Sequence, residues 1–247
     1  MEIAPEIYIY CIIDDNTLKT DLKLKGIGDS EVFILPLNNL GVIAGNFRIR
    51  KENDPDYIKN CAMQHEHLIE SLMERYTVLP VKFHTVFKDK ISAIQAFQKH
   101  YSDFEDNIKR LRNKIEYGLK VLWPLKEIQN NLDINSRDKE RVIEGDSESK
   151  KYLKNKYIKY KQSEALKELA KARSDEISKY LDNFAVEKKL KLLQTDSLFL
   201  NAVYLVDKID IKDFLEAFRK LKEDMGSKYE FLFTGPWPPY NFITLKR

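Results

Sequence analysis

The sequence predicts an α+β protein with two domains, an N-terminal α+β domain over residues 1–113 and a C-terminal ferredoxin-like domain over residues 114–247. Short β-branched and aromatic runs alternate with amphipathic helical patterns along the chain. A switch from helix to strand near residues 112–118 marks the boundary, and the elements after it follow the order β-α-β-β-α-β. A long charged helical insertion, at about residues 126–190, interrupts this order after its first strand.

The first predicted strand is the continuous β-branched and aromatic run of residues 6–13, a pattern typical of a strand buried on both faces. Residues 31–36 and 40–45 predict a strand pair. A helix is expected from Asp54-Pro55, because Asp is a favoured N-cap and Pro is tolerated in the first turn. Its apolar face recurs every three or four residues, at Ile58, Ala62, His65, Ile69, Leu72 and Met73.

Residues 77–87 return to strand character around Pro80. A second helix is predicted from Asp89, with one apolar face that continues almost to the domain boundary. The members of that face are Ile91, Ile94, Phe97, Tyr101, Phe104, Ile108, Leu111 and Ile115.

The C-terminal domain is expected to begin with a strand over residues 117–123, which Pro124 ends. Residues 126–195 are predicted to be helical and highly charged, with a short edge strand near residues 189–195. A narrow apolar stripe in this region, interrupted by Arg173, indicates a helical arm packed on one side. The stripe consists of Leu166, Leu169, Ala170, Ile177, Leu181 and Phe184. The last predicted elements are a strand at residues 198–206, a helix at 211–225 and a strand at 229–234.

The chain ends in an aromatic and proline-rich segment, Gly235-Pro236-Trp237-Pro238-Pro239-Tyr240-Asn241-Phe242. Proline fixes φ and lacks an N–H donor, so Pro236 is expected to end any central strand pairing. Burial of Trp237, Tyr240 and Phe242 would each stabilise the fold by roughly 1.5–3 kcal/mol. The segment is stiff, and it fits a preorganised contact surface for a partner as well as it fits a wedge between the domains.

Residues 77–87 also support two interpretations, because large apolar side chains surround Pro80. They fit a core strand with a proline at the sheet edge. The alternative to this favoured interpretation is an edge that faces a partner and accepts its strand. In the second interpretation Pro80, Phe83 and Phe87 belong to the contact surface.

Six lysines and no acidic residue lie between residues 150 and 161. The lysines are Lys150, Lys151, Lys154, Lys156, Lys159 and Lys161, and Tyr152, Tyr157 and Tyr160 are interleaved with them. The pattern fits a solvated face of the arm, a docking site for an acidic protein surface, or a grip on single-stranded nucleic acid. The aromatic RNA-binding consensus is absent from residues 198–206, which disfavours nucleic acid.

The sequence shows no catalytic, metal or cofactor motif, and we expect a protein that is not an enzyme and takes no small-molecule substrate. In His65-Glu66-His67 the histidines are two apart, whereas a helical zinc pair needs them four apart. Gly26-Ile27-Gly28 lacks the third glycine of a dinucleotide fingerprint. Cys11 and Cys61 lie far apart and are expected to be buried thiols in a reducing cytoplasm.

Neither a signal peptide nor a membrane span is predicted. The first residues carry two acids and no basic region. No stretch approaches the ~18 apolar residues that a spanning helix needs. We therefore expect a cytoplasmic protein without a lipid-membrane partner, and any contact with an apolar surface to be peripheral.

Three blocks, in order along the chain, carry a resemblance to a known family. They are residues 7–13 with the following Gly26–Gly28 and 40–44, then Thr77–Phe87, and finally Gly235–Phe242. Together they closely resemble the GvpF/GvpL family of gas vesicle proteins. One position departs from the pattern, because His84 stands where the family usually has Gly. The blocks span nearly the whole chain, and the resemblance implies the same two-domain α+β arrangement.

The resemblance implies an accessory or minor structural protein of gas vesicles, the gas-filled protein shells that give some microbes buoyancy. It implies binding to the small hydrophobic major shell protein and to other accessory proteins, in support of vesicle nucleation or assembly. We expect partner binding at Pro80, Phe83, Phe87, Trp237, Tyr240, Phe242, Lys150, Lys151 and Lys154, and no cofactor. The alternative is a nucleic-acid-binding module that uses Lys150–Lys161.

Overall fold

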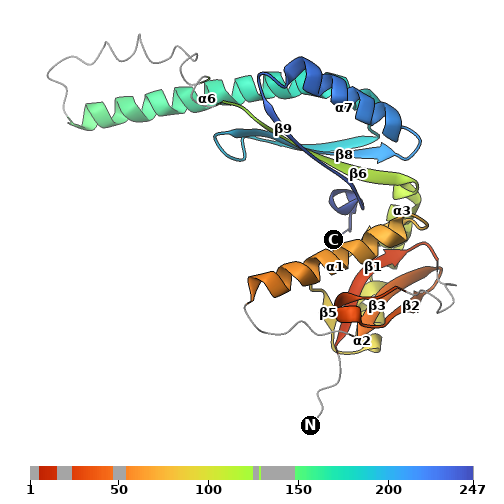
Figure 1. Ribbon diagram of the computed structural model, residues 1–247. Helices are drawn as coiled ribbons and strands as arrows, with labels where there is room; N and C mark the ends of the chain where they lie inside the picture. Colours follow the sequence, from red (N-terminus) through yellow and green to blue (C-terminus); the bar gives the residue numbers. More distant parts are fainter. Residues whose placement is uncertain (1–5, 16–23, 47–53, 125–127, 129–147, 247) are drawn as a thin grey trace. The chain divides into compact units, whose positions relative to one another are not determined.

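The structure, a computed structural model, describes residues 6–15, 24–46, 54–124, 128 and 148–246 (Figure 1). It is a mixed α/β structure with two antiparallel sheets and helices, as the sequence predicts at this level. Two compact units make up the chain. The first unit comprises Met1–Glu116 and Pro236–Arg247, and the second comprises Tyr117–Gly235. The last residues of the chain thus join the first unit, whereas the sequence placed them in the C-terminal domain.

The sheet of the first unit has the order β2-β3-β1-β4, with β5 also paired to β1. Its strands are β1 (Ile7–Ile13), β2 (Val32–Leu37), β3 (Leu40–Asn46), β4 (Val78–Pro80) and β5 (Val86–Phe87). All residues of β1 are buried, which confirms the strand buried on both faces. The predicted strand pair is confirmed in β2 and β3, and the turn between them places Asn38 at φ 51°.

The first two helices of the first unit begin where the sequence predicts. Asp54 caps α1 (Pro55–Met73), and its carboxylate accepts a hydrogen bond of 3.0 Å from the N–H of Asp56. Asp89 and Ser92 form a capping box at the start of α2 (Lys90–Gln98). Helix α3 (Tyr101–Leu111) follows after a break at residues 99–100.

The two faces of this sheet carry different helices. Tyr8 and Val86 stand opposite each other and share one face, on which the Tyr8 hydroxyl contacts α1. Ile7 and Phe87 share the other face. On that side Phe87 packs against Phe97 of α2, with ring centroids 5.8 Å apart. Helix α1 therefore covers one face, and α2 lies against the other.

Two predicted elements of the first unit differ from the structure. The strand expected over residues 77–87 is two short strands, because the chain bulges away from β1 between Val81 and Thr85, and His84 adopts φ 67°. The helix expected from Asp89 to Ile115 is divided into α2 and α3 and ends at Leu111. It ends there because Asn113 adopts φ 58°, which an α-helix does not accommodate.

The second unit is built on a sheet with the order β7-β8-β6-β9. Its elements are β6 (Lys114–Leu122), α6 (Glu148–Leu181), β7 (Glu187–Leu192), β8 (Leu198–Asp207), α7 (Ile211–Met225) and β9 (Glu230–Trp237). The sequence predicts α7 with the same bounds. Element order and strand order are consistent with the expected β-α-β-β-α-β arrangement, and the ferredoxin-like classification stays a prediction.

Strand β9 runs through Gly235 and Pro236 to Trp237, beyond the strand end that the sequence predicts at Thr234. The reason is position, since β9 is the last strand in the sheet order and a proline is tolerated at an edge. Gly235 adopts φ 121°, a backbone conformation that residues with a side chain rarely take.

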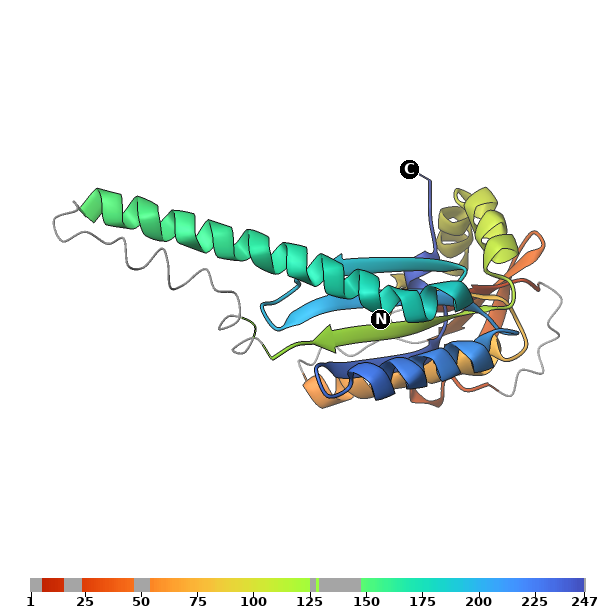
Figure 2. The ribbon, with the colours of Figure 1, turned by 90° about the horizontal axis from the view of Figure 1, so that it is seen from above.

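The two halves of α6 have different surroundings (Figure 2). The C-terminal half packs within the second unit through a buried stripe. The stripe contains the predicted Ala170, Ile177 and Leu181 together with Ser174 and Ser178. The N-terminal half projects beyond the end of the sheet of this unit, as Figure 2 shows. The prediction of an arm packed on one side is confirmed for its C-terminal half.

Candidate functional site

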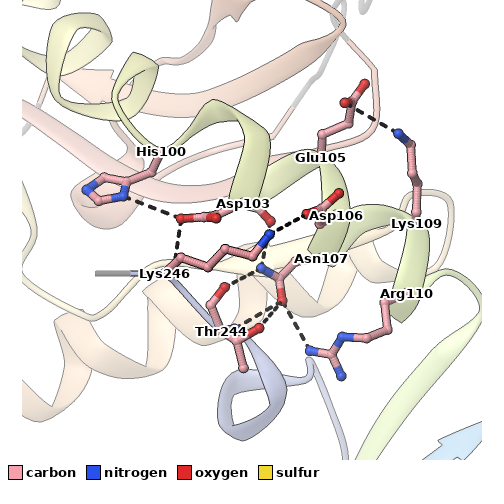
Figure 3. A network of polar contacts seen from close by, with 9 residues as sticks. All are labelled: His100, Asp103, Glu105, Asp106, Asn107, Lys109, Arg110, Thr244 and Lys246. Atoms are coloured by element: carbon pink, nitrogen blue, oxygen red, sulfur yellow. Dashed lines mark hydrogen bonds and ion pairs between the residues drawn. The ribbon is translucent and has the colours of Figure 1, made fainter.

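The end of the chain, residues 238–246 (the C-terminal strap), is bound to α3 of the first unit (Figure 3). Phe242 is fully buried in a short 3-10 turn, Tyr240–Phe242. Arg110 of α3 donates a hydrogen bond to the carbonyl oxygen of Phe242. The aromatic tail is therefore docked on its own unit through burial and through backbone hydrogen bonds.

Asn107 is the centre of this contact (Figure 3). Its side-chain amide donates to the carbonyl oxygen of Thr244 at 2.6 Å and accepts from the N–H of Thr244 at 3.0 Å. One side chain thus pairs with the strap backbone as a neighbouring strand would. One turn earlier in α3, the Asp103 carboxylate accepts a hydrogen bond of 3.0 Å from the N–H of Lys246.

Two glutamates hold the preceding residues of the strap. The Tyr240 hydroxyl lies 3.0 and 3.1 Å from the two carboxylate oxygens of Glu66 in α1. Glu116 accepts hydrogen bonds from both the N–H (2.8 Å) and the side-chain amide (2.6 Å) of Asn241. Burial raises the pKa of Glu66, and the Tyr240 hydrogen bond opposes that rise. Burial and the Glu66 carboxylate both raise the pKa of Tyr240.

A hydrogen-bonded chain crosses the core from β1 to the bulge at residues 81–85. The N–H of His84 donates to the Tyr8 hydroxyl (3.1 Å), which lies 3.1 Å from Nδ1 of His65. Nε2 of His65 lies 3.1 Å from the carbonyl oxygen of Val81. Because a carbonyl only accepts, we assign the proton to Nε2, and Nδ1 accepts from Tyr8. The prediction that His65 belongs to the core is confirmed.

His65 is fully buried, and burial lowers its pKa to about 4. The imidazole is therefore neutral at pH 7, with both ring nitrogens hydrogen-bonded to the protein. Its function in this arrangement is to hold the bulge in one conformation above the Tyr8 ring, which packs against Phe83 with ring centroids 6.5 Å apart.

At the edge of the first sheet beside this bulge, the strand register determines which backbone N–H and C=O groups point outward. In an antiparallel ladder, directly opposed residues alternate between pairs that exchange hydrogen bonds and pairs whose backbone groups point away from each other. The N–H of Ile9 donates to the carbonyl oxygen of Thr85, and Tyr8 and Val86 form the next pair. Val86 therefore directs its N–H and C=O away from β1, toward the outer edge.

The same alternation explains Pro80. The N–H of Val81 donates to the carbonyl oxygen of Tyr10 at 3.0 Å, and Cys11 and Pro80 form the adjacent pair. The nitrogen of Pro80 thus points to the outer edge, where the missing N–H takes no hydrogen bond from β1. Pro80 consequently offers no N–H to an added strand at its position of β4, whereas Val86 of β5 does.

The structure brings together two of the predicted contact residues and separates a third from them. Phe83 and Tyr240 pack against the same buried cluster, which includes Tyr8. Val86, which the sequence did not single out, packs there too and is half-buried. Phe87 lies on the opposite face of the sheet, against α2.

The remaining predicted contact residues have different surroundings. Pro80 and Phe242 are buried, so this conformation does not offer their side chains to a partner. Trp237, at the end of β9, is half-buried. Lys150 is exposed at the start of α6, and Lys151 and Lys154 lie in the same helix with side chains outside the described part of the structure.

Sequence reasoning misses the residues that fix the strap, above all Asn107 and Glu116. Both are buried, and a buried polar side chain requires a hydrogen-bond partner. Asp103 and Asn107 stand four residues apart on the buried side of α3. A polar pair on the buried side of an amphipathic helix could have indicated a bound segment, although not which one.

A pocket of about 600 Å³ in the second unit lies between the end of β6 and the turn that joins α7 to β9. Its described lining includes Trp123, Tyr229 and two lysines, Lys222 and Lys228, with Glu230 as the one acid and neither histidine nor cysteine. Burial raises the pKa of Tyr229. The described lining also contains Ser227, without a histidine to activate it.

Two further findings concern the described residues alone. Within residues 6–15, 24–46, 54–124, 128 and 148–246, His, Cys, Asp and Glu side chains form no group of three or more that could hold a metal ion. None of the helices in that part of the chain combines the length and the apolar character required to cross a membrane.

Residues 6–244 match the protein family described as gas vesicle synthesis protein GvpL/GvpF. Gas vesicle protein L1 of Halobacterium salinarum is 23% identical over 257 residues, which covers 95% of this chain and 89% of that protein. Gas vesicle protein F of Dolichospermum flosaquae is 23% identical over 247 residues and covers 97% of this chain and 98% of its own length.

Two crystal structures resemble the whole chain. Gas vesicle protein GvpF from Anabaena sp. PCC7120 superposes with a TM-score of 0.80 at 17% identity, covering 99% of this chain and 100% of that one. GvpF from Microcystis aeruginosa has a TM-score of 0.79 at 19% identity and covers 97% and 99% of the two chains. The likeness shows a common fold along the full length of the chain.

Proposed function

The chain belongs to the GvpL/GvpF family of gas vesicle synthesis proteins, and from that membership we propose that it binds the hydrophobic shell protein of the vesicle and supports vesicle nucleation or assembly. Participation in gas vesicle formation comes with the family. The proposal adds the direct partner and the surface. It also places the chain at the gas vesicle in the cytoplasm, with other gas vesicle accessory proteins as further partners.

The chemistry of the partner explains why such a protein is needed. A small shell subunit with an amphipathic, β-rich surface aggregates unless its apolar face and strand edges are covered. An accessory protein can cover them by adding a strand or offering an apolar surface, and can release them at the growing shell.

The observation that carries the proposal is the outer edge of the first sheet at β5. Val86 directs its N–H and C=O outward, and the half-buried side chains of Phe83 and Val86 lie beside that edge. An incoming strand would gain backbone hydrogen bonds there and would cover this apolar surface. Pro80 has no N–H to offer at its position of β4, which favours β5 as the place of addition.

The C-terminal strap supports this surface from within. Tyr240 packs against the buried cluster that also contacts Phe83 and Val86, and Glu66 fixes its hydroxyl. We therefore assign Tyr240 and Phe242 to the folding of the first unit, and we keep the half-buried Trp237 as a contact residue. The element and strand order of the second unit support the further proposal that it is ferredoxin-like.

A binding assay between the purified chain and the major shell protein, at low and moderate salt, tests the proposal. Val86→Pro removes the outward N–H and leaves the hydrogen bonds to β1 in place, whereas Val86→Ala keeps the N–H and shortens the side chain. We expect salt-resistant binding that Val86→Pro weakens by roughly tenfold or more and Val86→Ala by less. Circular dichroism and thermal melting confirm that both variants are folded.

The outcomes separate the two parts of the proposal. Equal binding by parent chain and folded Val86→Pro would show that strand addition at β5 is wrong. Binding that disappears on modest salt addition would point to an electrostatic site elsewhere on the chain. Absence of binding at either salt would show that the shell protein is not the direct partner.

A further inference from the structure

The projecting half of α6 exposes an unusual amount of apolar and aromatic surface. Tyr152, Leu153, Tyr157 and Tyr160 are 57–65% exposed and lie between residues 152 and 160. No other stretch of nine described residues holds four exposed large hydrophobic side chains. Contiguous exposed apolar surface on a helix marks a site that another molecule covers.

Two side chains of this surface continue the seam along which α6 packs in its own unit. Ala170 follows Tyr152 by 18 residues, and Ser178 follows Tyr160 by the same number. At about 3.6 residues per turn that separation is about five full turns, so each pair lies on one line along the helix. Ala170 and Ser178 are buried against the second unit. Tyr152 and Tyr160 therefore extend the line of that seam, whereas Leu153 and Tyr157 align with the exposed Lys171 and Asp175.

The charge around the exposed seam has one sign. Lys150, Lys156, Lys159 and Lys161 are exposed, and no acidic residue occurs between residues 150 and 161. The ammonium of Lys161 lies 5.7 Å from the centroid of the Tyr157 ring, which keeps positive charge beside the aromatic surface. A second copy of this helix would bring like charges together, so the charge favours an acidic partner over self-association.

The packed half of α6 shows how such a contact is made. Tyr180 of α6 donates a hydrogen bond of 3.0 Å to the carboxylate of Asp224 in α7, and the two helices lie against each other. A tyrosine on α6 thus pairs with a carboxylate on a neighbouring helix. The projecting half repeats the tyrosines and adds lysines, so it presents donors to carboxylates along a helical face.

We propose that residues 150–161 form a docking site for an acidic amphipathic helix of a protein partner. The apolar face of that helix covers Leu153, Tyr157 and Tyr160, and its carboxylates pair with the lysines on either side. A single convex helix offers no groove to follow a nucleic-acid backbone, which argues against that occupant. The site lies on the second unit, and it does not depend on shell-protein binding at β5.

A labelled synthetic peptide tests this docking site on the full chain. The peptide is an amphipathic helix of about three heptads with Leu at positions a and d and Glu at the flanking positions. A peptide with Lys in place of Glu and an oligothymidine strand are the control ligands. Binding is followed by fluorescence anisotropy at low and moderate salt.

Two double variants and one matched control separate shape from charge. Tyr157→Ala with Tyr160→Ala removes aromatic surface and keeps every lysine. Lys156→Glu with Lys159→Glu reverses charge in the site, and Lys212→Glu with Lys220→Glu makes the same charge change on exposed positions of α7. All six positions are solvent-exposed, so circular dichroism should show unchanged folds.

We expect the acidic peptide to bind and the basic peptide not to bind. Each double variant of the site should weaken binding by roughly tenfold, and the α7 control should change it by less than about threefold. No binding of the acidic peptide would overturn the proposal, as would equal binding by the parent chain and the tyrosine variant. Tighter binding of the oligothymidine at these residues would also overturn it, in favour of nucleic acid.

Discussion

Replacing Asn107 by Ala should release the C-terminal strap without unfolding the chain. The substitution removes the two hydrogen bonds that the Asn107 side chain makes with the backbone of Thr244, at 2.6 and 3.0 Å. A hydrogen bond of this kind contributes about 0.5–1.5 kcal/mol net, so the pair is worth about 1–3 kcal/mol. The equilibrium constant for opening of the strap should therefore rise by about 5- to 150-fold.

Hydrogen–deuterium exchange measures this opening directly. The amides of Asn241, Thr244 and Lys246 donate to side chains of Glu116, Asn107 and Asp103, and their exchange reports the closed strap. In Asn107→Ala the exchange of a C-terminal peptide covering residues 238–246 should accelerate by that factor. Exchange in the central strand β1 should accelerate by no more than the same factor and should stay far slower than exchange in the strap, because β1 exchanges only when the unit unfolds globally.

A neighbouring ion pair supplies the matched control. Lys246 lies 3.1 Å from Asp106, and its side chain is 79% exposed. An exposed pair contributes little, so Asp106→Ala should leave strap exchange almost unchanged. The reasoning is refuted if Asn107→Ala exchanges like the parent chain, or if Asp106→Ala accelerates exchange as much as Asn107→Ala.

Three further predictions concern stability, each read from urea unfolding. Burial lowers the pKa of His65 from 6.5 to about 4, so between these pH values the unfolded state binds a proton that the native state does not. The free energy of unfolding should therefore fall by up to roughly 3 kcal/mol as the pH drops from 6.5 to 4. His65→Gln should reduce this pH dependence. Tyr240→Phe removes the hydroxyl that satisfies Glu66 and should destabilise the chain by about 1–3 kcal/mol; an unchanged midpoint would contradict this role. Gly26→Ala places a methyl group against the Tyr10 hydroxyl, which accepts a hydrogen bond from the N–H of Ile27. The variant should lower the free energy of unfolding by about 1–3 kcal/mol. An unchanged stability would show that Tyr10 can move aside.

Sequence patterns correctly predicted the helices and strands that are determined by residues close together in the sequence. The buried run of β1, the Asp54 cap of α1 and the amphipathic period of α7 are each encoded within a few turns or strands of sequence. The same holds for the alternation of strand and helix that defines the α+β class. These features appear in the structure where the sequence places them.

Features that depend on distant residues were not predictable in this way. The bulge at residues 81–85 depends on Tyr8 and His65, which are separated from it in sequence. The strap depends on partners such as Glu66, 174 residues away from Tyr240. The passage of β9 through Pro236 depends on its edge position, which only the assembled sheet defines.

The candidate site was predictable in part for the same reason. The sequence singled out Phe83 and the aromatic tail by composition, and the structure brings Phe83 and Tyr240 to one cluster. It could not show that Phe242 is buried or that the backbone of Val86 points outward, because both follow from strand register and from the docking of the strap.

The most direct test of the proposed function is hydrogen–deuterium exchange of the chain alone and with the major shell protein. Strand addition at β5 should protect the amide of Val86, whose N–H points outward, and should slow exchange in a peptide covering residues 83–87. Exchange at residues 150–161 of the arm should change little with this partner. Binding that leaves residues 83–87 as exchangeable as in the free chain would contradict the proposed surface.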